Sequence, residues 1–367
     1  MIAKDKKPHT IDDLNKHYKQ AEEADSELFA EMRSNLLLEA GNQYSKKLQS
    51  GIFNQIRNSV RLSEAQKLRI VKNHLQKITK TYKNAILEKM PGVSVVPHNE
   101  LDMQDKKAAE LNQGVWEDMQ ERYGLHEHRK EGVSNFVTMG ERCSFVYYDD
   151  QYGAIKGYEQ MLTPEGVPAF DQMGNPVPDE SKPVYEGVLC FKNIPAYNLL
   201  RALNAKSMKS SPYLIIREMM DVKELAAAYE NEPDKLAKVK GSSDEEFVVF
   251  DSNKKSYQEG KEEILIRYHF FRPCARYPDG YFFVCVKGGI LEEGALPYGI
   301  FPVLTAGFDR LPDNPRSVSI IRVARPYQAE INRASSQMAT HQVTLGDDKI
   351  LYQGGTKLSP GALLPGV

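Results

Sequence analysis

The sequence predicts an α+β fold, and three observations support this prediction. Helical periodicity runs through residues 26–139, short aromatic and β-branched runs occupy much of residues 143–312, and a helical period returns after Pro312. Helices and strands that are separated along a chain favour an α+β architecture over alternating βαβ units. The length of 367 residues is typical of two or three domains.

The helical part of the sequence follows a polar beginning. Residues 1–25 are rich in charged residues and poor in apolar ones, and they predict a weakly ordered N-terminal arm. Ser26 is a candidate N-cap, after which apolar residues recur at helical spacing as far as Gly41. A capping-box sequence at Ser63 predicts a second helix, which should end near residue 90. Two further helices are expected over residues 102–123 and 125–139.

Short runs of aromatic and β-branched residues predict the strands. These runs are residues 143–148, 153–158, 184–193, 213–220, 247–251, 264–271 and 281–287. The insert at 162–183 is rich in Pro and Gly and is expected to form an exposed loop or hairpin tip. Residues 222–240 are expected to form one small helical segment with Asp221 as its N-cap.

The composition argues against several classes of protein. Lys and Arg number 48 against 50 Asp and Glu, and this balance argues against a protein that mainly neutralises nucleic-acid phosphates. No window is apolar enough for a membrane span, and the N-terminus lacks the apolar stretch of a secretion signal. The four cysteines lie too far apart for a zinc site or a disulfide framework, so we expect reduced packing cysteines at Cys143, Cys190, Cys274 and Cys285.

Candidates for chemistry are few. The common catalytic signatures for nucleotide binding, acyl transfer and zinc-dependent hydrolysis are absent. His126 and His128 lie two residues apart on an expected helix, where they point about 200° from each other and cannot share one metal ion. The pairs Asp149-Asp150 and Asp347-Asp348 could bind a divalent cation with other carboxylates, but such pairs more often lie in turns. We therefore expect no catalytic residue, metal site or cofactor.

Residues 313–345 predict one long helix, in which Asn314 caps the first turn and Pro315 occupies the first helical position. Pro326 should kink this helix or start a new one. Polar residues, Asn332 among them, lie on its opposite face. A core helix packed on two sides would show the same period as a subunit interface. The apolar residues recur in steps of four and three as a heptad-like seam, which contains Ile320, Ala324, Tyr327, Ile331, Ala334 and Met338.

The region around this helix resembles a known family. Phe301-Pro302-Val303 precedes a polar turn at 309–315, and the helix then contains Gln328 and an Ile-Asn-x-x-x-Ser pattern at 331–336. This order of a proline, a polar turn and such a helix resembles the portal proteins of tailed bacteriophages, particularly those of the short-tailed type.

The earlier layout agrees with this resemblance, which extends over about residues 30–367. A short strand at 93–97 ends the first helices and precedes a helix that contains Trp116. The resemblance implies a wing at 26–312, a first stem helix at 313–345 and the start of a clip at 346–367. Portal chains continue through a second stem helix and a crown, so the sequence is expected to end before those segments.

The resemblance also implies a structural protein and not an enzyme. Portal proteins form a dodecameric ring at one vertex of the capsid, through which a separate motor drives double-stranded DNA inward and later lets it out. The expected partners are further copies of the chain, the terminase motor, a head-tail adaptor, capsid protein and DNA in transit, with no membrane. The expected location is the virion, after assembly in the host bacterial cytoplasm. Two alternatives remain open, a metal-dependent nuclease that uses the acidic pairs and another component of the capsid or tail.

Overall fold

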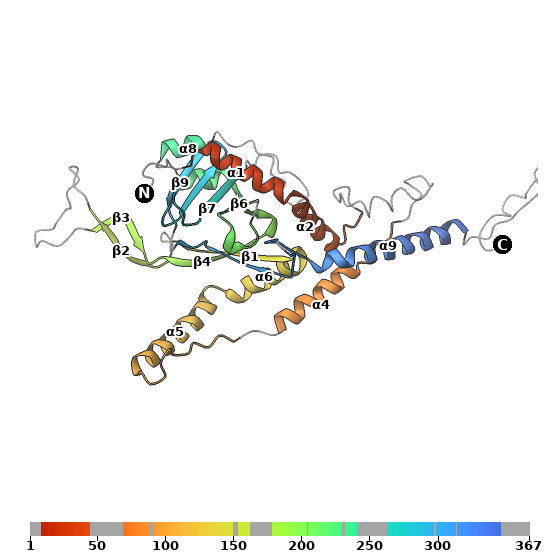
Figure 1. The fold of residues 1–367 in the computed structure, drawn as a ribbon, viewed down its shortest axis with the longest axis horizontal. Coiled ribbons are helices and arrows are strands. Elements are labelled where there is room, and N and C mark those ends of the chain that lie inside the picture. Colours follow the sequence, from red (N-terminus) through yellow and green to blue (C-terminus); the bar gives the residue numbers. More distant parts are fainter. Residues whose placement is uncertain are drawn as a thin grey trace, which may run out of the picture.

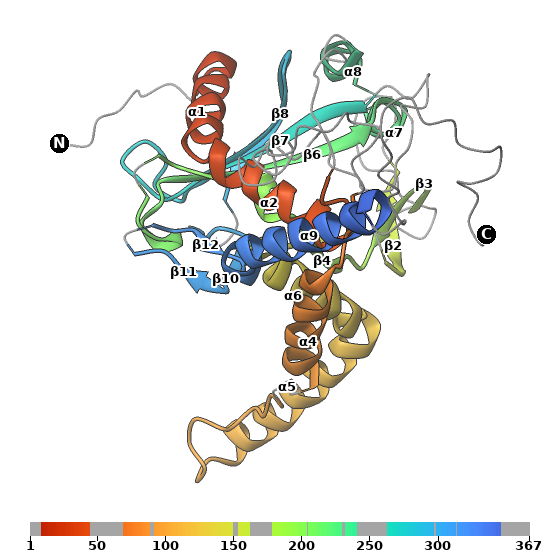
Figure 2. The same cartoon turned by 90° about the vertical axis from the view of Figure 1, so that its right-hand side faces the viewer.

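The protein has an α+β architecture in which two sheets pack on each other and helices cover their outer sides. Figures 1 and 2 show α1 and α2 along one side of the sheets, a leg of α4, α5 and α6 on another side, and α9 extending away from the body. The computed structural model describes residues 9–44, 69–88, 92–149, 153–161, 178–203, 205–229, 232–240, 263–296, 299–312 and 314–345.

The helices fall into an N-terminal group, a small central pair and the long final helix. In the described residues the α-helices are α1 (Ile11–Ala24), α2 (Ser26–Glu39), α4 (His74–Glu88), α5 (Met103–Arg122), α6 (Leu125–Met139), α7 (Val222–Ala228), α8 (Pro233–Lys240) and α9 (Ile320–Leu345). Two single turns of 3-10 helix are η2 (Ala196–Asn198) and η3 (Met208–Ser210). None of the described helices is long and apolar enough to cross a membrane.

The strands pair antiparallel throughout. The larger sheet has the order β5 (Leu199–Arg201), β6 (Tyr213–Asp221), β7 (Glu263–Phe271), β8 (Tyr281–Val286) and β9 (Gly289–Ala295). The smaller sheet has the order β10 (Val303–Gly307), β1 (Glu141–Asp149) and β4 (Val188–Ile194). Two hairpins pair β2 (Ile155–Gln160) with β3 (Pro178–Tyr185) and β11 (Asp309–Arg310) with β12 (Ser317–Val318).

Alternation along β7 explains how the layers stack. His269 and Phe271 face the first helices, and the ring of His9 stacks on Phe271 with 4.5 Å between centroids. The intervening Phe270 lies against Phe145 of β1, with centroids 6.0 Å apart. Because successive side chains of a strand point to opposite faces, one strand joins the helical layer to the smaller sheet.

The predicted N-terminal arm is wrong for the part that the structure describes. Residues 11–24 form the regular helix α1, which begins with a capping box between Thr10 and Asp13. Leu14 and Ala21 are fully buried in the main core. The stripe of Ile11, Leu14, Tyr18 and Ala21 has helical spacing, and its tertiary packing supplies the stability that the polar composition concealed.

Other helix boundaries also differ from expectation. The expected N-cap Ser26 is the first residue of α2, and Asp25 precedes the helix. The carboxylate of Asp25 does not cap the helix but binds Arg316. The helix expected from Ser63 is described only from residue 69, and its helical part begins at His74. The segment expected at 222–240 is two helices, α7 and α8, although Asp221 does cap the first by accepting from the N–H of Lys223 over 2.8 Å.

The helices expected at 102–123 and 125–139 are confirmed as α5 and α6. The strand runs are confirmed as β1, β2, β6, β7 and β8, whereas the run at 184–193 divides between β3 and β4. Part of the insert at 162–183 is strand, since β3 begins at Pro178 and pairs with β2. The strand expected at 247–251 and the clip segment at 346–367 lie outside the described residues.

Candidate functional site

The long helix α9 leaves the body from a tightly packed start. The hydroxyl of Ser319 accepts from the N–H of Ile321 over 3.0 Å and donates to the carbonyl of Val137 over 2.6 Å. Ile321 is fully buried and packs in a small cluster with Leu37, Leu38, Leu75 and Ala329. Ser319 therefore caps α9, and the expected cap Asn314 instead accepts from the N–H of Arg316 in the turn before β12.

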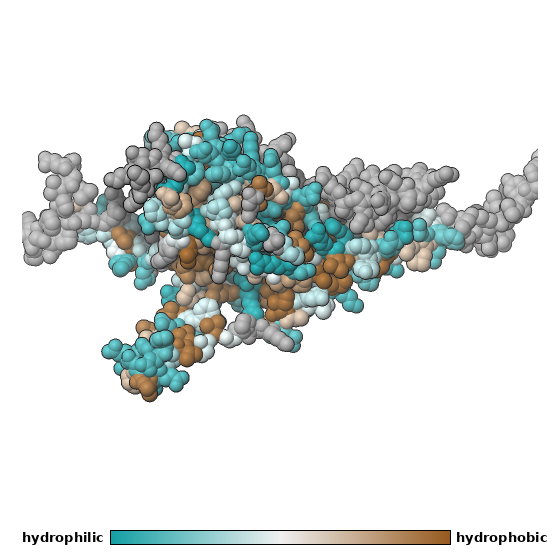
Figure 3. Space-filling model, in the orientation of Figure 1, coloured by the Kyte–Doolittle hydropathy of each residue, from teal (hydrophilic) through white to brown (hydrophobic). Residues whose placement is uncertain are grey.

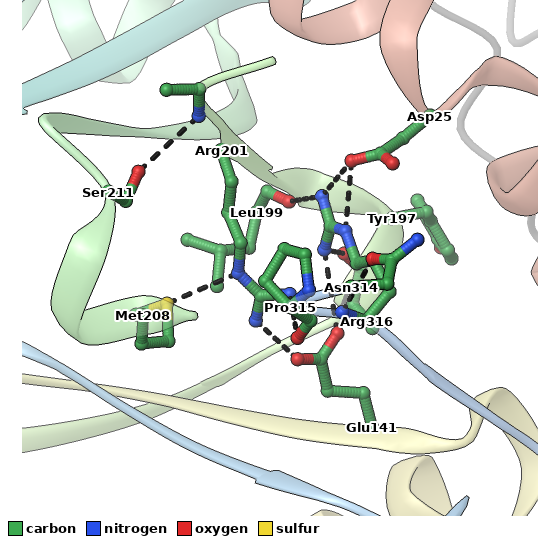
Figure 4. A network of polar contacts seen from close by, with 12 residues as sticks. Asp25, Glu141, Tyr197, Leu199, Arg201, Met208, Ser211, Asn314, Pro315 and Arg316 are labelled. Carbon is green, nitrogen blue, oxygen red and sulfur yellow. Dashed lines mark hydrogen bonds and ion pairs between the residues drawn. The ribbon is translucent and has the colours of Figure 1, made fainter. Parts of the chain in front are cut away.

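A buried network of charges fixes the chain just before α9 (Figure 4). The guanidinium of Arg316 donates to one carboxylate oxygen of Asp25 through Nε over 2.9 Å and through Nη2 over 2.7 Å. Its Nη1 lies 3.4 Å from Glu141, which also pairs with Arg201. Two guanidiniums thus face two carboxylates, and Arg316, Arg201 and Glu141 are each at most 2% exposed.

Carbonyl groups complete this network. Arg316 also donates to the carbonyl of Leu199 over 2.8 Å, and Arg201 donates to the carbonyl of Pro315 over 2.9 Å. Burial alone would lower the pKa of Arg201, but the neighbouring Glu141 carboxylate raises it above its ordinary value. The network therefore joins the α1–α2 turn, β1, β5 and the start of α9 into one rigid base.

Three uncharged polar residues, Gln328, Asn332 and Ser336, form a ladder along one face of α9. Their spacing of four residues places them on the same side of the helix. Asn332 is fully buried, and its amide oxygen accepts from the N–H of Lys72 over 3.1 Å. Ser336 accepts from the N–H of Ile70 over 3.0 Å. The ladder therefore holds the extended segment before α4 along the face of α9.

Gln328 also caps α4 from outside that helix. Its amide oxygen accepts from the N–H of His74 over 2.9 Å and from the N–H of Leu75 over 3.2 Å. Asn73 caps the next N–H, that of Gln76, over 3.2 Å. The free N–H groups in the first turn of a helix need such acceptors. Here two of the three N–H groups bind an acceptor on another helix. These caps fit a helix that begins at His74.

Further amide contacts extend the ladder to the end of α2. The amide nitrogen of Asn332 donates to the amide oxygen of Gln43, and the amide nitrogen of Gln43 donates to Asn73 over 3.1 Å. The amide nitrogen of Gln328 donates to the carbonyl of Lys72 over 2.6 Å. Every member of this amide network has partners within the same chain, so this face of α9 is fully used inside the subunit.

The opposite face of α9 is apolar and uncovered. Val323 is 61% exposed, Tyr327 71%, Ile331 37% and Met338 58%. Ala334 lies between the last two and is also exposed. These residues repeat at steps of three and four, so they form one continuous stripe, which we call the outward stripe.

The predicted seam is therefore divided by the structure. Tyr327, Ile331, Ala334 and Met338 lie in the outward stripe. Ile320 and Ala324 are partly buried and pack against the cluster of Leu37, Leu38 and Leu75 in the same chain. Pro326 lies inside a continuous helix, so the new helix start expected there is wrong.

The ladder was missed as a site because polar residues opposite a seam suggest a solvated face. Gln328 and Asn332 are at most 1% exposed, whereas the charged Arg333 nearby is exposed and pairs with Glu330. The available signal was the chemistry of the side chains. Short uncharged amides and hydroxyls at four-residue spacing can satisfy main-chain groups, which arginines cannot do as acceptors.

The acidic and cysteine residues considered as catalytic or metal-binding candidates do not form a common site in the described part of the chain. Among the described residues, no group of three His, Cys, Asp or Glu side chains could hold a metal ion. Asp149 ends β1, and Asp150, Asp347 and Asp348 lie outside the described residues. Cys143 and Cys285 are buried packing residues, and burial raises the pKa of the Cys143 thiol. Cys274 is exposed, so the packing role expected of it is wrong.

No protein-family model matches the sequence, and no curated protein matches it.

Proposed function

We propose that the chain is a portal-type structural protein that forms a ring at one capsid vertex. In this role it is a conduit for double-stranded DNA during packaging and ejection, and a docking site for the packaging motor and the tail. The observation that carries the proposal is the division of α9. Its polar face is occupied by the subunit's own chain, whereas its outward stripe exposes Tyr327 and Met338 to an extent that favours burial by a neighbouring copy.

A second exposed apolar surface supports a head-to-tail ring. Such a ring requires two different surfaces on each subunit. Within the leg, α5 lies apart from α9 (Figure 2), whereas α4 packs against it. The exposed apolar residues of the leg include Val96, Leu101, Met103, Leu111 and Val115.

The sequence pattern gives independent support. Gln328, Asn332 and Ser336, which form the ladder, belong to the pattern on which the resemblance to portal proteins rests. Near neutrality of the whole chain suits a conduit, because strong phosphate contacts would slow the passage of DNA.

The two alternatives have less support. A nuclease needs convergent carboxylates, and within the described part of the chain no such group is found. Another capsid or tail component would share the outward stripe and differ in the symmetry of its assembly.

Electron microscopy of negatively stained full-length chain, with native mass measurement at micromolar concentration, tests the proposal. We expect rings of twelve subunits with a central hole. A monomeric mass would contradict the proposal, and rings or tubes of another symmetry would favour a different structural component. Magnesium-dependent cleavage of plasmid DNA by the pure protein would favour the nuclease.

A further inference from the structure

A large groove lies between the leg and the smaller sheet, and its lining includes none of the outward stripe. Its volume is about 1070 Å³, just above the usual range of about 300–1,000 Å³ for ligand pockets. Figure 3 shows apolar residues gathered where the leg meets the body. The apolar lining comes from α4, α5, α6, β1, β4, β10 and the segment before α5, and includes Ile86, Val93, Trp116, Val133, Phe136, Val146, Phe191 and Leu304.

The charged lining of this groove is mainly basic. Arg129, Arg142 and Lys192 line it together with one carboxylate, that of Glu121. Lys192 pairs with Glu218 on β6. No carboxylate of the described residues forms an ion pair with Arg142, whose Nε donates to the hydroxyl of Ser144 over 3.2 Å.

The position of Arg142 depends on a glycine. A Cβ atom on Gly132 of α6 would lie 2.3 Å from Nε of Arg142, so only glycine lets the guanidinium lie against the helix. Burial, and then repulsion by Arg129, lowers the pKa of Arg142. The fold therefore holds a guanidinium at the groove without an acidic partner among the described residues.

Two polar atoms of residues at the groove lie behind its surface. The indole N–H of Trp116 and Nδ1 of His128 are shielded from solvent and make no hydrogen bond with the described residues. Neither atom is open to the groove in this conformation, so the features that a ligand would meet are the apolar walls and the basic charge.

One segment of the chain outside the described residues has the complementary chemistry. Residues 244–251 read Asp-Glu-Glu-Phe-Val-Val-Phe-Asp, four apolar residues flanked by four carboxylates. The helix α8 ends at Lys240, before this segment, and Figures 1 and 2 place α8 on the opposite side of the sheets from α5 and α6. A neighbouring copy can supply the segment without wrapping it around its own subunit.

We propose that the groove binds residues 244–251 of a second copy of this chain. The four apolar side chains lie against the walls around Trp116 and Phe191, and the carboxylates face Arg129 and Arg142. This inference rests on the proposed ring, because it requires a neighbouring subunit. It adds a clasp between subunits that is separate from α9.

Trp116 is the only tryptophan, so its fluorescence reports directly on the groove. The experiment adds a synthetic peptide of residues 242–253 to full-length chain whose own segment is neutralised as D244N, E245Q, E246Q and D251N, since this leaves the groove vacant. We expect a saturable shift of Trp116 emission that weakens with added salt. A peptide with the same four neutral substitutions should bind at least tenfold more weakly. No shift with the acidic peptide, or equal binding of both peptides, would overturn the proposal.

Substitutions at the groove give a second readout. Arg142→Gln should weaken binding of the acidic peptide at least tenfold, whereas Lys80→Gln on the exposed face of α4 should leave it unchanged. Equal effects of the two substitutions in folded protein would contradict the role of Arg142. The peptide comparison does not depend on these variants and stays decisive if Arg142→Gln fails to fold.

Cross-linking identifies the copy that supplies the segment. A photo-cross-linking residue in place of Phe247 should join two chains, with the link mapped to the groove. Cross-links confined to one chain, or links outside the groove, would overturn the proposal. Native mass measurement separates this inference from the proposed function. Rings without cross-links to the groove refute only the clasp, whereas monomers refute the ring itself.

Discussion

The start of α9 and the middle of α9 are attached to the same body by different chemistry. At the start, Arg316 is held by ion pairs with Asp25 and Glu141. In the middle, Gln328 and Asn332 are held by uncharged amide and main-chain partners. The comparison teaches that both regions order the helix, but loss of one partner has different consequences, because a stranded buried charge costs more than a stranded amide.

The largest effect is expected in the charged region. Glu141→Gln keeps the shape of the side chain but leaves Arg201 and Arg316 with Asp25 as the only carboxylate of the network. We expect a loss of about 3–5 kcal/mol in the free energy of unfolding, measured with urea. Asp118→Asn removes an exposed pair with Arg122 and serves as the control, with a loss of at most about 1 kcal/mol. A similar small loss for both variants would remove the distinction between the two regions.

A smaller loss is expected in the ladder. Asn332→Ala deprives the N–H of Lys72 and the amide of Gln43 of their partner, and this should cost about 1–3 kcal/mol. The matched substitution Gln337→Ala, on the exposed side of the same helix, should be nearly neutral. Hydrogen exchange at residues 70–75 should accelerate only in the first variant. Unchanged exchange there would show that the ladder does not hold this segment.

Acid should weaken the packing of α1 against the larger sheet and leave the ladder on α9 unchanged. Burial, together with Arg276, lowers the pKa of His9 to about 4, and burial also lowers the pKa of His17 and of the fully buried His269. The unfolded chain binds these protons from about pH 6.5 downward, so stability should fall as the pH falls from 6.5 toward 4. Because solvent screens the partly exposed His9, we expect the free energy of unfolding to fall by about 1–2 kcal/mol between pH 6.5 and pH 4.

Hydrogen exchange compared at pH 7 and pH 4.5, after correction for the intrinsic rate, measures this difference. Residues 11–24 should lose protection, while residues 70–75 should keep it, because Gln328, Asn332 and Ser336 do not titrate. Equal loss in both segments would mean that acid acts on the whole fold and not on α1.

The smallest effect on an isolated subunit is expected in the outward stripe. Tyr327→Ser should change the free energy of unfolding by less than about 0.5 kcal/mol, since its side chain is 71% exposed. Ile331→Ala should cost the isolated subunit less than Asn332→Ala, in reverse of the order that the apolar seam alone suggests. Urea unfolding of dissociated subunits measures both variants, and a larger loss for Ile331→Ala would place that residue inside the subunit core.

Periodicity in the sequence was sufficient to predict α5, α6 and most strands. The pattern of apolar and polar residues within each of these segments is enough to indicate its secondary structure. Periodicity did not predict α1, whose polar residues find partners such as Arg217 far along the chain. It placed Asn332 opposite the apolar seam but did not show that this face is buried, because the segment that covers this residue lies 260 positions away. Long-range polar pairing leaves no local periodic signal.

The assembly state of an outward-stripe variant tests the central claim most directly, that α9 uses one face within the subunit and the other between subunits. The variant replaces Tyr327, Ile331 and Met338 by Ser, and the control replaces the exposed residues Glu330, Arg333 and Gln337 by Ser. Native mass measurement should find folded, smaller species for the first variant and intact rings for the second. Intact rings for both variants, with unchanged unfolding, would contradict the account.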